Sequence, residues 1–121
     1  MNGRLTTHVL DLVQGKPAAG MTIELYYFGI RDRVQLGRFE TNADGRLDRP
    51  MLQGSELQAG QYELVFAAGD YLKQATDGVT SASLASIFDL IPIRFRVTDP
   101  EAHYHVPLLV APGGYSTYRG S

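Results

Sequence analysis

Short runs in which apolar and polar residues alternate recur along most of this chain, and each run is bounded by Gly, Pro, Asp or Asn. Every second side chain of a β-strand faces the same side, so this alternation is typical of strands that bury one face. The bounding residues are those that form turns between strands. We therefore expect an all-β domain.

The alternating runs predict about eight strands and one short helix. The helix is expected over 69–76, where Asp70 can cap the first turn and Tyr71, Leu72 and Ala75 follow at helical spacing. Turns recurring at intervals of about 8 to 12 residues favour a sandwich of two sheets. A loop with one helical turn near 84–88 is expected over 77–90. The predicted strands cover 5–12, 21–28, 34–41, a short segment from Arg46, 61–67, 92–98, 103–110 and 114–121.

Composition narrows the class of protein further. The chain has 121 residues and no internal repeat or linker, so we expect a single domain over 1–121. It has no cysteine, which excludes disulfides, thiol catalysis and thiolate metal sites. The formal net charge is -2, with both signs scattered along the sequence, so nucleic acid is not an expected partner.

No apolar run has the length of a signal peptide or of a membrane span. We therefore expect a cytoplasmic protein with no membrane association.

The histidines are the first candidates for chemistry, because imidazole exchanges protons near neutral pH. His8 falls in the middle of a predicted strand, and His103 and His105 share one face of another. Taken alone, such residues fit a polar strand surface. A His-x-His pair with a distant histidine also resembles a metal site, but no carboxylate is placed beside them as a further ligand.

Two arginines and a tyrosine are the next candidates. Arg46 follows the Asn-Ala-Asp-Gly turn at 42–45, and Tyr118 and Arg119 lie near the end of the sequence. A guanidinium can hold a planar polar substrate by paired hydrogen bonds and can stabilise charge developing on an oxygen. Solvated surface charge is the alternative, and spacing alone does not show that these groups meet the histidines.

Several motifs together resemble the transthyretin-like 5-hydroxyisourate hydrolases of urate breakdown. The resemblance covers 5–121, and the closing Tyr-Arg-Gly-Ser separates these hydrolases from the hormone-carrying transthyretins. The motifs are Leu-Thr-Thr-His-Val-Leu-Asp at 5–11, Gly-Lys-Pro-Ala-Ala-Gly at 15–20, Thr-Asn-Ala-Asp-Gly-Arg at 41–46, His-Tyr-His-Val-Pro-Leu-Leu at 103–109 and the tail at 115–121.

The resemblance implies a sandwich of two four-stranded sheets and a homotetramer with sites where subunits meet. In one sheet of this family the first, fourth, seventh and eighth strands lie together. They would bring His8, Arg46, His105 and Tyr118, respectively, to one sheet face.

The implied reaction opens the six-membered ring of 5-hydroxyisourate to give 2-oxo-4-hydroxy-4-carboxy-5-ureidoimidazoline, with no metal and no cofactor. His8 and His105 would activate water, and which of the two takes the proton is left open. Arg46 would bind the substrate and stabilise the oxyanion. Tyr118 would contact the substrate. Ser121 would orient the imidazoles or the water, and Arg119 would hold the tail and support binding.

Two other classes remain to be compared with the hydrolase. A carrier on the same fold would need an apolar channel, whereas one lined by His8, Arg46, His105 and Tyr118 is polar. A purely structural sandwich would not explain where the histidines and arginines stand in the sequence.

Overall fold

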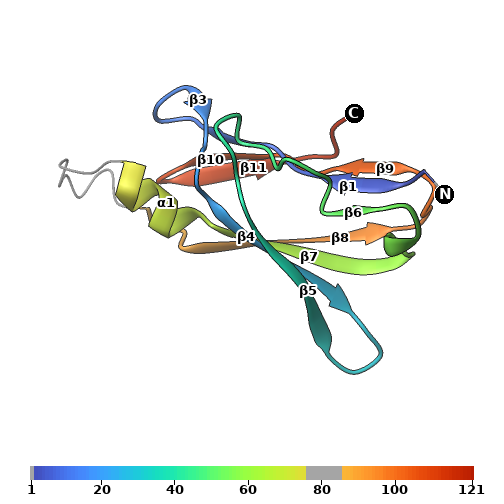
Figure 1. Cartoon of the computed structure of the whole chain (residues 1–121). Helices are drawn as coiled ribbons and strands as arrows, with labels where there is room; N and C mark the ends of the chain where they lie inside the picture. Colours follow the sequence, from blue (N-terminus) through green and yellow to red (C-terminus); the bar gives the residue numbers. More distant parts are fainter. Residues whose placement is uncertain (1, 76–85) are drawn as a thin grey trace.

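The computed structural model describes residues 2–75 and 86–121 and has two β layers with a helix at one end (Figure 1). One layer is an antiparallel sheet in the order β5 (Arg33–Glu40), β4 (Thr22–Phe28), β7 (Gly60–Ala67) and β8 (Leu90–Val97). Its alternation is the one expected from the sequence: Ile91 and Val97 are buried, while Arg94 and Arg96 point outward.

The other layer consists of two ladders that continue each other end to end. The first has the order β6 (Leu52–Gln53), β1 (Arg4–Thr6) and β9 (His103–His105). The second has the order β11 (Gly114–Thr117), β10 (Leu108–Ala111), β2 (Val9–Asp11) and β3 (Lys16–Pro17). A 3-10 turn, η1 (Gly54–Glu56), follows β6. Because β2 and β10 continue the paths of β1 and β9 after short interruptions, the layer follows the strand order that the resemblance implied.

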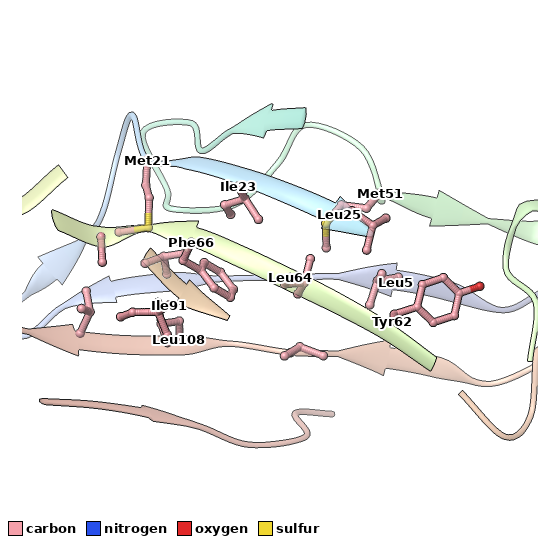
Figure 2. Packing of buried hydrophobic residues seen from close by; sticks show 14 of the residues in the cluster. Leu5, Met21, Ile23, Leu25, Met51, Tyr62, Leu64, Phe66, Ile91 and Leu108 are labelled. Atoms are coloured by element: carbon pink, nitrogen blue, oxygen red, sulfur yellow. The ribbon is translucent and has the colours of Figure 1, made fainter. Parts of the chain in front are cut away.

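The core lies between the two layers (Figure 2). Leu5, Val9 and Leu108 come from one layer and are fully buried. Leu64 and Phe66 meet them from the other layer and are also fully buried. Burial of each such side chain contributes about 1.5–3 kcal/mol, which is how a chain without cross-links holds together. The predicted sandwich with one short helix is confirmed.

The helix α1 (Ala68–Ala75) is close to its predicted position, and its Tyr71 fixes it to the second layer. The Tyr71 hydroxyl donates to Asp11 Oδ2 at 2.7 Å, and the backbone N–H groups of Val13 and Gln14 donate to Asp11 Oδ1. In the part of the chain that is described, no helix is long and apolar enough to cross a membrane. The predictions for 77–85 fall outside the described residues, and no helix is present at 86–88.

Two predicted strands were wrong in one respect, because 5–12 and 103–110 are each interrupted in the middle. Thr6 and His8 carbonyls still accept from the Val106 and Leu108 N–H groups across the interruption. Between these two bonds, however, the Thr7 hydroxyl donates to the Val106 carbonyl at 2.7 Å. The Val106 carbonyl thus accepts from a side-chain hydroxyl at this step of the ladder. Pro107, the next residue, has no N–H to donate. His8 therefore lies between strands and not within one.

The strand predicted from Arg46 was also wrong, since residues 42–46 fold back as a closed turn. The Asn42 side-chain oxygen accepts from the Asp44 and Arg46 N–H groups, and the Asn42 N–H donates to the Arg46 carbonyl at 2.7 Å. Backbone groups satisfied within the turn are not free to pair in a ladder. The strand of this region is β6, which begins later, at Leu52.

Gly45 docks this turn into the interruption beside His8. Its carbonyl accepts from the Val9 N–H at 2.8 Å, and its φ is +73°. A Cβ at this position would collide with the Val9 carbonyl oxygen and lie 3.1 Å from the Pro17 Cβ. Only glycine allows both the backbone conformation and this close approach.

Replacing Gly45 by Ala should therefore destabilise the protein by about 3 kcal/mol, from left-handed strain together with steric overlap. Gly15→Ala is the matched control, because Gly15 has φ +66° with nothing within 4 Å of the added Cβ. That change should cost only about 1 kcal/mol. Urea unfolding of the two variants measures the difference, and equal losses would contradict the proposed close docking.

Candidate active site

A hollow of about 380 Å³ opens where the turn carrying Arg46 faces strands β1 and β9. Its lining includes Thr6 on β1, the segment 46–50, His105 on β9, and Ser121. These elements are far apart in the sequence. The parallel pairing of β1 with β9 and the docking of the turn at 42–46 bring them together.

The lining carries more positive than negative charge. Arg4, Arg46 and Arg49 contribute guanidinium groups, and Asp48 contributes a carboxylate. The Asp48 carboxylate accepts a hydrogen bond from the Asn42 side-chain amide at 2.9 Å, so part of its hydrogen-bonding capacity is used within the turn. Such a hollow favours a small polar ligand and stabilises negative charge that develops on it.

His8 and His105 are half-buried and interact with the same guanidinium. Partial burial lowers the pKa of His8, and the positive charge of Arg46 lowers it further. A hydrogen bond with the backbone of Asp44 acts in the opposite direction on the His8 pKa. Burial, then Arg46 and then His8, lower the pKa of His105. Both imidazoles are thereby kept neutral near pH 7, as a proton acceptor requires.

The ring of His105 is held from two sides. Thr6 lies opposite His105 in the parallel register, and its Oγ1 is 2.8 Å from His105 Nδ1. Gly120 packs against the other side, where an added Cβ would collide with His105 Cδ2. The Gly120 N–H also donates to the His105 carbonyl at 2.7 Å.

Arg119 fixes the tail along β9. Its Nη2 donates to the His103 carbonyl at 2.9 Å, and its Cζ lies 4.4 Å from the centre of the Tyr104 ring. Tyr104 is buried, and its hydroxyl accepts from the Thr98 and Asp99 N–H groups. Through this anchor the last two residues are placed beside His105.

The structure thus brings His8 and His105 into interaction with Arg46. Arg46, His105 and Ser121 line the hollow, whereas His8 is not among its lining residues. Arg119 donates to the His103 carbonyl on β9 but is not itself among the residues that line the hollow. Tyr118 is not part of the lining either, and its side chain is 59% exposed.

Other lining residues were not singled out from the sequence. Thr6, Arg4 and Arg49 reach the hollow through strand register and loop path, which short motifs do not reveal. His103 also lines it, and the His-x-His spacing had already placed that residue on the face of His105. Within the described ranges, no three side chains of the types His, Cys, Asp or Glu gather in a way that could hold a metal ion.

A second hollow of about 450 Å³ lies near α1 and includes Lys16, Tyr71 and Gln74 in its lining. None of the candidate residues from the sequence lines it. The chemistry therefore points to the hollow beside His105, although it is the smaller of the two.

Comparison with known proteins gives one family over nearly the whole chain. Residues 5–120 match the model of the HIUase/transthyretin family. A 5-hydroxyisourate hydrolase from Mesorhizobium japonicum is 55% identical over 119 residues, which covers 98% of this chain and 93% of that protein.

Solved structures share the fold. One of an (S)-allantoin synthase superposes with a TM-score of 0.88 at 45% identity; the match covers 99% of this chain but only 44% of that longer protein. Transthyretin from Sparus aurata superposes with a TM-score of 0.84 at 21% identity, covering 97% of this chain and 96% of that one, which shows the fold alone.

Replacing Arg46 by Gln should raise the pKa of both His8 and His105, because a positive charge that disfavours protonation is removed. Titration of the imidazole resonances by NMR measures both values, and added salt should reduce the difference from the wild type. Arg38→Gln, on the outer strand β5, is the charge-matched control and should leave both values unchanged. Unchanged values in Arg46→Gln would contradict the proposed electrostatic contact.

Proposed function

This chain belongs to the HIUase/transthyretin family, and from that membership we propose that it hydrolyses 5-hydroxyisourate to 2-oxo-4-hydroxy-4-carboxy-5-ureidoimidazoline. The observation that carries the proposal is that two half-buried imidazoles, His8 and His105, interact with the Arg46 guanidinium, and that Arg46 and His105 line a polar hollow. The chain is also 55% identical to a relative that bears this enzyme name. A cytoplasmic location stays a prediction.

The reaction cleaves the amide C–N bond of the six-membered ring. We propose that His105 accepts a proton from water while the hydroxide so formed adds to the ring carbonyl carbon. Arg46 then stabilises the negative charge on the former carbonyl oxygen. Collapse of this intermediate breaks the C–N bond, and the proton held by the imidazole is delivered to the leaving nitrogen.

His8, which lies in the interruption between β1 and β2, is the second imidazole of the proposed site. Its partial burial and its interaction with Arg46 keep it neutral, so it is suited to hold the substrate or the water by hydrogen bonds. Partial burial and the positive charge of Arg46 lower the pKa of His105, which favours the neutral base before water is deprotonated. No covalent enzyme intermediate is needed in this mechanism, and all its steps use groups of the chain and water.

The tail at 118–121 is proposed to support catalysis by placing groups beside the hollow. Ser121 lines the hollow and is proposed to orient the water or an imidazole. Arg119 supports substrate binding indirectly, because its contacts with His103 and Tyr104 hold the tail in place. Tyr118 is 59% exposed in the single chain. This exposure is consistent with a homotetramer in which a neighbouring protomer covers Tyr118 and the substrate lies between subunits.

A carrier of an apolar ligand is the less favoured function on this fold. Its site would be lined mainly by hydrophobic and aromatic side chains. The hollow described above instead presents three arginines and two histidines, Arg4, Arg46, Arg49, His103 and His105.

The ultraviolet decay of freshly generated 5-hydroxyisourate, with and without the protein, tests the proposed reaction. The protein should accelerate the decay and give a single enantiomer of the product. Exhaustive chelation should leave the rate unchanged. Decay at the uncatalysed rate would overturn the assignment, and loss of activity on chelation with recovery on addition of one metal would overturn the metal-free mechanism.

Replacing His105 by Asn should lower kcat by about 10²-fold or more, the usual contribution of a general base. The fold should persist, because asparagine is smaller than histidine and the site is only half-buried. Steady-state kinetics with thermal unfolding of the same sample separates the two effects. Near-normal kcat in a folded variant would remove His105 from the mechanism.

Deleting 118–121 should lower kcat far more than it lowers stability. The deletion removes the Arg119 contact with His103 and the Gly120 bond to His105, both at the edge of the layer. We expect at least a tenfold loss of kcat, on the scale of a misplaced catalytic group, with a fall in Tm of about 5 °C or less. Loss of folded protein in parallel with loss of rate would instead make the tail structural.

A further inference from the structure

We propose that Thr6 is a positioning residue that holds the His105 ring with Nδ1 protonated, so that Nε2 is the atom that accepts the proton from water. This inference rests on the proposed hydrolysis and names a role for a residue outside the His8, Arg46 and His105 set. It starts from one contact, between Thr6 Oγ1 and His105 Nδ1 at 2.8 Å.

The contact is built into the strand pairing. Thr6 on β1 lies directly opposite His105 on β9, and the Thr6 carbonyl accepts the Val106 N–H at 3.0 Å on the same step. Threonine is β-branched and therefore restricted about χ1 in a strand. The hydroxyl thus meets the ring from a backbone that is fixed and from a side chain with few alternatives.

The ring has little freedom to turn away from this partner. Thr6 and His105 are both half-buried, and Gly120 packs against the ring carbon next to Nε2. A rotation that moved Nδ1 away from Thr6 would swing the ring toward the tail. The hydroxyl therefore defines the Nδ1 side, and the Nε2 side is left for the hollow.

A neutral imidazole carries one N–H donor and one acceptor nitrogen. If Nδ1–H donates to Thr6 Oγ1, the lone pair on Nε2 is available to take a proton from water. The opposite tautomer, in which the threonine hydroxyl donates to Nδ1, would place an N–H where the base is needed. After proton transfer Nδ1–H still donates to Thr6, so this hydrogen bond persists through the step.

The uncharged nature of the partner also fits the site. A carboxylate at this position would favour the imidazolium and keep the base protonated. Threonine orients the ring without that charge, while burial and the positive charge of Arg46 disfavour the protonated form. Orientation and electrostatics are thus supplied by different residues.

Three variants test the proposal: Thr6→Ser keeps the hydroxyl, Thr6→Ala removes it from the same short side chain, and Thr6→Val removes it while keeping β-branching. We expect Thr6→Ser to retain kcat within about threefold. Thr6→Ala and Thr6→Val should each lose about tenfold in kcat with KM changed much less, because the hydrogen bond that orients the ring is lost while the groups that bind the substrate remain. Thr98→Val, at an exposed position beyond β8, is the matched control and should leave kcat unchanged.

The tautomer is read directly from the ¹⁵N shifts of the His105 ring above its pKa. The wild type and Thr6→Ser should show Nδ1 protonated, and Thr6→Ala should shift toward Nε2 protonated. A wild-type ring protonated on Nε2, or equal kcat in the Ser and Ala variants, would overturn the proposal. Since this signature needs no turnover, failure of the wild type to hydrolyse 5-hydroxyisourate would defeat the proposed function and leave the test of Thr6 intact.

Discussion

The interruption of the parallel pairing between the two central strands is the constraint on which the site depends. At this point the Thr7 hydroxyl bonds the Val106 carbonyl, and the Val9 N–H turns to the Gly45 carbonyl. The Val9 N–H lies on the opposite edge of its strand from β10, the edge where the Val9 carbonyl accepts from the Ala18 N–H, so the turn at 42–46 docks there without competing with the parallel pairing. This docking places Arg46 near His8, at the interruption, and near His105 on β9.

The charged groups at the site then determine which function this fold can support. The same sandwich superposes on an (S)-allantoin synthase and on a transthyretin with TM-scores of 0.88 and 0.84, so the fold alone does not assign a function. Arg46 disfavours protonation of both His8 and His105, and the same positive charge favours an oxyanion, so in the proposed mechanism one residue would serve both the base and the transition state.

Much of this could be predicted from the sequence, and the exceptions have identifiable causes. Alternation gave the buried face of β8, and the motif around Asn42 and Gly45 gave the tight turn. The strand expected from Arg46 failed because the Asn42 side chain closes the turn on itself. Thr6 was not singled out, since its contact with His105 depends on the parallel register of residues 99 positions apart.

The most direct measurement is a structure of the protein with a stable 5-hydroxyisourate analogue in which the scissile amide is replaced. The account predicts that the analogue lies in the hollow beside β9, with its carbonyl oxygen toward Arg46 and the attacked carbon facing His105 Nε2. An analogue bound in the hollow near Tyr71 and Gln74, or one that leaves Arg46 and both imidazoles in solvent, would contradict it.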